Sequence, residues 1–184
     1  MKYFLTTLLV VLMISCNSTS ELKKEFPCTT SSPFSNLQQT EDVRNLFSMS
    51  LPKNWKVNLF FDNGQTAIYT ADTTVNLTKT IIMDASYIHS AINFDAVFQQ
   101  KMTADNTKME LTETKAKKIT LFNKPSYISY AAGKKGTYSY HVLNTFTKVN
   151  SDNFLHVKTE IYGDTKVEER LCNAINLIDK IQLK

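Results

Sequence analysis

The residues Phe47-Ser48-Met49-Ser50-Leu51-Pro52-Lys53-Asn54-Trp55 (47–55) hold the pattern that decides the fold class. Apolar residues at positions 47, 49 and 51 alternate with serines, which predicts a strand that buries one face. Pro52 ends this strand because proline has no N–H to donate to a ladder. Trp55 opens a second apolar run, and Asp62-Asn63-Gly64 follows it. Since Asn-Gly between two such runs is a strong hairpin signal, residues 66–70 are expected to form the next strand.

The rest of the chain alternates between strand and helix patterns. Further strands are expected at residues 79–89, 109–114, 117–122, 126–132, 137–149 and 154–162. One helix is expected to begin near Asn93, with an apolar face made of Phe94, Val97, Phe98 and Met102. A second is expected from the capping box Thr165-x-x-Glu168, with an apolar stripe of Val167, Leu171, Ala174, Ile175 and Ile178. This order predicts an α+β fold, a mainly antiparallel sheet with helices on both faces.

The hairpin of residues 126–149 is expected to be covered on both faces. If the turn spans Gly133 to Gly136, Ala132 lies opposite Thr137. One face then carries Tyr127, Ser129, Tyr138, Tyr140, Val142 and Phe146. The other carries Ile128, Tyr130, His141 and Leu143. Because both sets include bulky apolar side chains, both faces are expected to be packed against other elements.

Residues 1–15 have the pattern of a bacterial lipoprotein signal peptide. Lys2 supplies a short positive region, and residues 3–14 are mostly apolar. This run fits a secretory signal and is shorter than the roughly 20 apolar residues of a membrane span. Met13-Ile14-Ser15-Cys16 resembles a lipobox, which implies cleavage before Cys16 and acyl chains, palmitate among them, on that residue. The expected location is the bacterial cell envelope, where lipid would hold the protein on the outer membrane or on a membrane surface that faces the periplasm.

The chain after the signal is expected to divide into a tether and one domain. Residues 16–33 are polar, hold two prolines and lack periodicity, so they are interpreted as a flexible tether. Residues 34–184 form the single α+β domain of this interpretation, with a short helix around residues 40–46 and a short strand or coil at residues 181–183.

The stretch 47–55 resembles the opening of PsbP-like domains, in which an alternating strand meets a proline and then a tryptophan. The order that follows is also similar: a hairpin, a long strand, a helix, an antiparallel meander and a C-terminal helix. The resemblance covers about residues 44–184 and rests on one sharp motif, Pro52-x-x-Trp55. It implies an α/β/α sandwich, in a superfamily that includes many bacterial lipoproteins. Members of this superfamily include an extrinsic photosystem protein and a Ran-binding import factor, mostly accessory proteins without shared catalytic residues.

Charge and composition argue against several classes of partner. The net charge is +4, from 21 basic and 17 acidic side chains, and no basic run exceeds two residues. We therefore expect no nucleic-acid partner. The four glycines form none of the usual nucleotide-binding motifs, so no cofactor is expected. Arg44 and Arg170 are the only arginines, which disfavours sites that clamp phosphate or carboxylate groups.

The histidines His89, His141 and His156 show no metal-binding spacing. If residues 149 and 154 pair in a hairpin, His156 lies about 20 Å from His141, too far to share a metal. His156 is then expected on a solvated edge. No catalytic or metal site is therefore expected, and the protein is interpreted as a non-enzyme.

Two other groups of side chains are candidates for a role. The tyrosines Tyr127, Tyr130, Tyr138 and Tyr140 could line a ligand or partner surface, or could pack in the core. Cys28 and Cys172 could form a disulfide, which an exported protein permits, or remain separate thiols. Cys172 lies about 140° from Val167 on a helical wheel, at the flank of its helix, where a cysteine can reach another segment. Thr73 falls in a loose glycosylation pattern.

Two functions fit these expectations. The first is a lipid-anchored, non-catalytic envelope protein that acts as a binding or assembly module, with an envelope protein as its partner. The alternative is a small-ligand-binding lipoprotein that uses a tyrosine-lined crevice. An exposed apolar surface would favour the first, and a deep pocket would favour the second.

Overall fold

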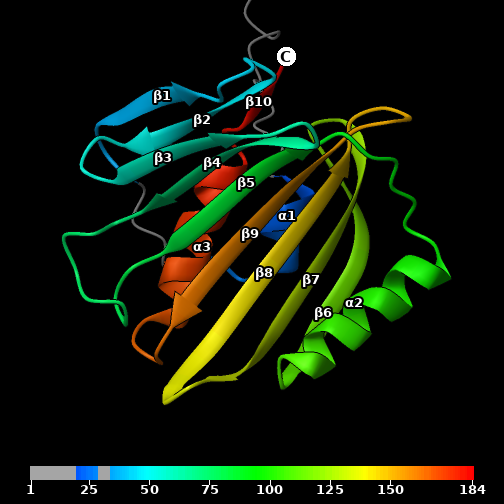
Figure 1. Cartoon of the computed structure of the whole chain (residues 1–184). Helices are drawn as coiled ribbons and strands as arrows, with labels where there is room; N and C mark the ends of the chain where they lie inside the picture. Colours follow the sequence, from blue (N-terminus) through cyan, green and yellow to red (C-terminus); the bar gives the residue numbers. More distant parts are fainter. Residues whose placement is uncertain (1–19, 29–33) are drawn as a thin grey trace, which may run out of the picture.

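The computed structural model describes residues 20–28 and 34–184, which form two antiparallel sheets and three helices (Figure 1). The larger sheet has the strand order β3-β4-β5-β9-β8-β7-β6. Its strands are β3 (Lys56–Phe61), β4 (Gln65–Ala71), β5 (Ile82–Ile88), β6 (Leu111–Leu121), β7 (Lys124–Lys135), β8 (Tyr138–Lys148) and β9 (Phe154–Tyr162). The smaller sheet has the order β1-β2-β10, with β1 (Leu37–Glu41), β2 (Phe47–Pro52) and β10 (Gln182–Leu183). The α+β fold expected from the sequence is confirmed.

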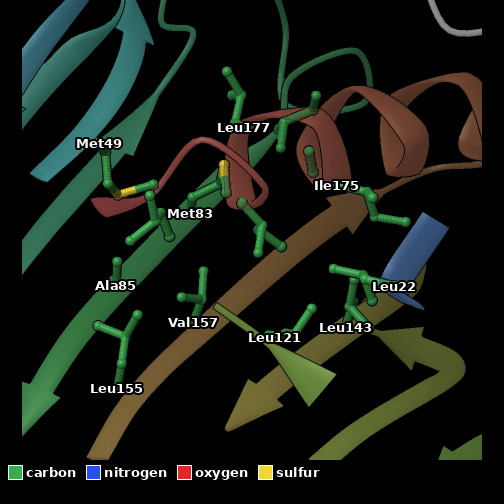
Figure 2. Packing of buried hydrophobic residues seen from close by; sticks show 14 of the residues in the cluster. Leu22, Met49, Met83, Ala85, Leu121, Leu143, Leu155, Val157, Ile175 and Leu177 are labelled. Atoms are coloured by element: carbon green, nitrogen blue, oxygen red, sulfur yellow. The ribbon is translucent and has the colours of Figure 1, made fainter. Parts of the chain in front are cut away.

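The main core lies between the larger sheet and a layer made of α3 (Val167–Ile178), α1 (Glu21–Glu25) and the small sheet. Figure 2 shows Met49 of β2 beside Met83 of β5, and Leu22 of α1 beside Leu143 of β8; Leu177 of α3 belongs to the same cluster. The opening stretch supplies this core directly, because Phe47, Met49 and Leu51 are fully buried. We call this side of the larger sheet the α3 face.

The opposite side of the larger sheet, the α2 face, carries α2 (Ala96–Lys108). Asp95 caps this helix by accepting a hydrogen bond from the Phe98 N–H, so the helix starts later than Asn93. Phe98 and Met102 pack on Tyr127 and Phe146. The α2 face therefore has its own smaller apolar cluster.

The predicted faces of the β7–β8 hairpin are correct, although the predicted turn is wrong. Lys135 pairs with Tyr138, so Ala132 lies opposite His141 and not opposite Thr137. This shift is an even number of positions, and an even shift leaves every side chain on its face. The turn falls later because Gly136 has a φ of 61°, which suits a tight turn.

The β8–β9 register differs from the prediction by one residue, and this corrects the place of His156. Lys148, not Val149, pairs with Phe154. His156 therefore lies opposite Phe146, and the two rings stack with centroids 4.2 Å apart. A shift of one position exchanges the faces of a strand, so His156 is not on a solvated edge.

The interpretation of residues 16–33 as one flexible tether is wrong for the part that the structure describes. Residues 21–25 form α1, and Leu22 and Phe26 are buried in the main core. Ser20 Oγ accepts from the Lys23 N–H and caps the helix. Residues 16–19 and 29–33 of the proposed tether lie outside the described residues, as do Cys16 and the expected signal peptide.

The short helix expected around residues 40–46 is not formed, because β1 and a turn occupy this segment. The Asp42 carboxylate, 4% exposed, accepts from the N–H groups of Arg44, Leu46 and Phe47. It also accepts from Thr66 Oγ1 at 2.9 Å. Asp42, which lies in the first turn of the helix expected from the sequence, thus closes the β1–β2 turn and links it to β4.

Candidate binding surface

The α2 face is only partly covered by its helix. Figure 1 shows α2 near the β6 end of the sheet, while no helix of the described residues covers β9 and β5 on that side. A groove of about 660 Å³ lies between the helix and the sheet. We call it the α2 groove; its lining includes Ile92, Phe98, Met102, Asn106, Asn144, Phe146, Phe154, His156 and Lys158.

The floor of the α2 groove is aromatic with a polar centre. Phe146 stacks on His156 and also lies 6.5 Å from Phe154 between ring centroids. Asn144 Oδ1 accepts a hydrogen bond from His156 Nε2 at 3.0 Å. Burial, helped by the positive charge of Lys158, lowers the pKa of His156 to about 4. The imidazole is therefore neutral at pH 7 and leaves Nδ1 as an acceptor.

Asn106 adds a second polar group to this groove from the helix side. Its side chain is 2% exposed, and Nδ2 donates to Glu113 Oε1 at 3.2 Å and to Ser129 Oγ at 3.4 Å. Its Oδ1 has no hydrogen-bond partner among the described residues. A buried amide oxygen without a donor is costly, so a ligand N–H or O–H at this place would be stabilising.

A cluster of charged and aromatic side chains lies beside the groove and shares Lys158 with it. Glu160 accepts hydrogen bonds from Lys158 Nζ at 2.9 Å and from the Tyr140 hydroxyl. Lys135 Nζ lies 4.9 Å from the Tyr140 ring centroid and 5.3 Å from that of Tyr162. Burial alone would raise the pKa of Glu160, but these hydrogen bonds and the lysine charges lower it overall. The carboxylate is therefore ionised at pH 7.

The predicted tyrosine surface does not form as one crevice. Tyr127 is buried beneath α2 against Phe98, with ring centroids 5.2 Å apart. Tyr130 lies on the opposite face, where its hydroxyl contacts His141 Nδ1 at 3.1 Å. Only Tyr138, which is 43% exposed, and the buried Tyr140 lie near each other, both beside Tyr162. These four residues were correctly divided between the two faces from the sequence. However, Tyr127, Tyr130 and Tyr140 contact other residues of the fold and do not form one open surface.

The other candidate residues are spread over the molecule. Cys28 and Cys172 form a disulfide with a Cα–Cα distance of 5.3 Å, between the segment after α1 and the middle of α3. His89 lies at an exposed site between Arg44 and Asn153. Thr73 is exposed in the loop after β4.

The groove residues Asn106, Asn144 and His156 were missed from the sequence. The signal that could have found His156 is the β8–β9 register, because the observed pairing puts His156 opposite Phe146, on the α2 face that also carries Asn144. Among the described residues no group of three or more His, Cys, Asp or Glu side chains could hold a metal. What this arrangement offers a ligand is stacking, apolar contact and a few hydrogen bonds.

Within the described ranges 20–28 and 34–184, no helix has the length and apolar character needed to cross a membrane.

Comparison with known proteins gives a likeness of fold. No protein-family model matches the chain, and no curated protein matches it. The cyanobacterial PsbP (CyanoP) of Synechocystis sp. PCC 6803 is similar over 86% of this chain and 99% of its own, with 13% identity and a TM-score of 0.58. A point mutant of the protein Mog1 is similar over 81% of this chain and 96% of its own, with 8% identity and a TM-score of 0.53.

A structure from Bacteroides thetaiotaomicron VPI-5482 matches with 16% identity and a TM-score of 0.49. The match covers 82% of this chain and about half, 49%, of that one. The α+β architecture of this chain, with its two antiparallel sheets and three helices in the described residues, is the fold of PsbP and Mog1.

Proposed function

We propose that this chain is a lipid-anchored, non-catalytic binding or assembly module of the bacterial cell envelope, and that it binds its protein partner in the α2 groove. The observation that carries this proposal is the uncovered groove itself. Its lining is apolar at Phe98 on the helix side and Phe154 on the floor, while Asn106 Oδ1 is buried without a donor among the described residues. A surface of this kind, apolar with a few oriented polar groups, is typical of recognition sites.

The absence of a catalytic role is part of the proposal. His156 is held neutral by burial, and its hydrogen-bond partner is the Asn144 amide. A general base is normally oriented by a carboxylate and placed within reach of a nucleophile. The groove residues supply neither arrangement, so binding is the chemistry that they support best.

Site-specific photocrosslinking tests the partner surface. Val97 is 73% exposed at the groove rim, and Val43 is 46% exposed beside the β1–β2 turn. A photoreactive residue at position 97 of the full chain, expressed in its native envelope, should give one dominant crosslinked protein. The same residue at position 43 is the matched control and should not give this product. Equal labelling from both positions, or none from position 97, would contradict the proposed surface.

A small-ligand-binding lipoprotein is the second candidate, because the groove volume of about 660 Å³ falls within the size range of small-molecule sites. Native mass spectrometry of the full chain purified from its envelope distinguishes the two. A bound mass that is lost on Phe154→Ala would favour the ligand-binding function, whereas an unliganded chain that still gives the crosslink would favour the module.

A further inference from the structure

The edge strand β3 of the larger sheet is exposed and unusually apolar. Among residues 20–28 and 34–184 its one pairing partner is β4, and it is the last strand of the sheet order. Leu59, Phe60 and Phe61 are 47%, 51% and 57% exposed. Proteins normally protect such edges, since an unpaired apolar strand is a template for pairing with another chain.

The backbone groups that remain free on β3 can be assigned from its partners. The Asp62 N–H donates to Gln65 O at 2.9 Å, which directs residue 62 toward β4. Consecutive residues of a strand point their N–H and C=O groups to alternate sides. Residues 56, 58 and 60 therefore also face β4, and Val57, Leu59 and Phe61 present their backbone groups to solvent.

We propose that β3 is the interface of a symmetric dimer, in which it pairs antiparallel with β3 of a second copy of this chain about a two-fold axis at Leu59. The larger sheets of both copies then continue into each other. The faces of the two sheets match only if odd residues pair with odd residues. Leu59 lies opposite Leu59 of the partner subunit, and Val57 lies opposite Phe61 of the partner subunit. Backbone hydrogen bonds form at both pairs.

The side chains of β3 are complementary to themselves in this register. On the α3 face, where Val57 packs against the main core, all pairs across the axis are apolar. On the α2 face, Lys56 lies opposite Asp62 of the partner subunit, and this occurs twice by symmetry. Neither Lys56 nor Asp62 forms an ion pair among the described residues. Opposite charges directly across a ladder are stabilising.

Neighbouring registers lose this match. A shift of two residues in one direction places Lys56 opposite Phe60, and a shift in the other places it opposite Gly64. Asp62 then faces Asn54 or Asn58. Charge therefore selects the register centred on Leu59. This interface lies at the far end of the sheet from α2, so the dimer is independent of the proposed groove function.

Sedimentation of the full chain in detergent solution tests the dimer. The wild type should associate as its concentration rises. Leu59→Lys puts two like charges at the axis and should weaken the dimer at least tenfold, while Val97→Lys, an equal change on α2, should leave it unchanged. A wild type that stays monomeric up to its solubility limit, or a dimer that Leu59→Lys does not weaken, would overturn the proposal.

A charge rescue tests the register. Lys56→Glu should weaken association because it faces Asp62 of the partner subunit. Adding Asp62→Asn removes the repulsion, and the amide oxygen can still accept from the Gly64 and Gln65 N–H groups as Asp62 Oδ1 does at 2.7 and 2.9 Å. The double variant should regain part of the lost affinity, and no regain would refute this register. If a variant fails to fold, the amides of Val57, Leu59 and Phe61 in the wild type provide the readout. Their hydrogen exchange should slow with concentration, and exchange that does not slow would overturn the proposal.

Discussion

Arg170 shows how one buried side chain fixes the position of a helix. Its guanidinium donates from Nη1 to Thr80 O at 3.1 Å and to Tyr162 O at 3.0 Å, and from Nη2 to Gly163 O at 3.0 Å. These carbonyls lie before β5 and at the end of β9, so Arg170 joins α3 to the sheet. The low number of arginines in the sequence only disfavours sites that clamp phosphate or carboxylate groups; the structure shows that the Arg170 guanidinium binds the chain's own backbone.

Arg170→Met should therefore lower the free energy of unfolding by about 2–4 kcal/mol, because buried carbonyls lose charged donors. Urea titration checks this as a lower midpoint with an unchanged slope. Lys118→Met, at an exposed position, is the control and should change stability by less than about 0.5 kcal/mol. Equal midpoints for both variants would contradict the role given to Arg170.

His156 should make the stability depend on pH. Its pKa is lowered to about 4 in the folded chain, chiefly by burial, from an ordinary value of 6.5. As the pH falls below 6.5, His156 becomes protonated in the unfolded chain but stays neutral in the folded chain. The free energy of unfolding therefore decreases until about pH 4, by up to about 3 kcal/mol. His156→Gln should flatten this dependence in urea titrations at about pH 7 and about pH 4.5. Part of the slope should remain, since burial also lowers the pKa of His141.

Helix α1 could not be predicted from the sequence, because the N-terminal segment is mostly polar. Leu22 is fully buried, while Glu25 pairs with Lys115 at 3.4 Å and with Lys117 at 2.5 Å. Leu22→Ala should lower the free energy of unfolding by about 2–5 kcal/mol, as expected for a core leucine. Lys24→Ala, on the exposed side of the same helix, is the control. A neutral Leu22→Ala variant, by urea titration, would restore the tether interpretation.

The disulfide joins the segment after α1 to α3. Its cysteines are 144 residues apart. Closing a loop of that length lowers the entropy of the unfolded chain, which raises the free energy of unfolding by at most about 4–5 kcal/mol. The double variant Cys28→Ser/Cys172→Ser should therefore unfold at lower urea, yet keep α1 docked, because Lys23 also pairs with Asp179 at 3.2 Å. Thiol titration of protein taken directly from the envelope checks the bond itself, and two titratable thiols would contradict it.

Elements with strong periodicity could be predicted, and those held by long-range contacts could not. The stripe of α3 and the faces of β7 and β8 follow from side-chain order alone. Strand β1 is polar and mostly exposed, so only its pairing with β2 makes it a strand. The capping box at Thr165 is not used, because Lys166 takes a φ of 51° and α3 begins after it. The aromatic floor of the α2 groove could not be predicted, because it depends on the β8–β9 register, which the geometry of the loop between these strands determines.

At the scale of the whole molecule, the docking of α1 limits how far the domain can lie from a membrane. If Cys16 carries the lipid, Ser20 follows it by only four positions, and Ser20 Oγ donates to Asp179 Oδ2 at 2.8 Å. An extended chain spans at most about 3.6 Å per residue, so the start of α1 lies within about 14 Å of the anchor. A free tether of residues 16–33 would reach several times farther.

Energy transfer from a tryptophan placed at Lys24 to a fluorescent lipid headgroup measures this distance in vesicles, once the native Trp55 is replaced by Phe so that position 24 holds the one donor. We expect strong transfer from the anchored chain, since α1 is rigidly docked and close to the surface. A linker of about 15 Gly/Ser residues inserted after Ser18 should reduce the transfer, because its end-to-end distance grows by about 20 Å. Cys16→Ala should release the protein or strand it with its signal segment uncleaved, since the cysteine that would carry the acyl chains is gone. Transfer that is insensitive to the linker would mean that α1 leaves the core at the membrane. Intact-mass analysis that shows an unmodified chain beginning elsewhere than Cys16 would contradict the lipid anchor.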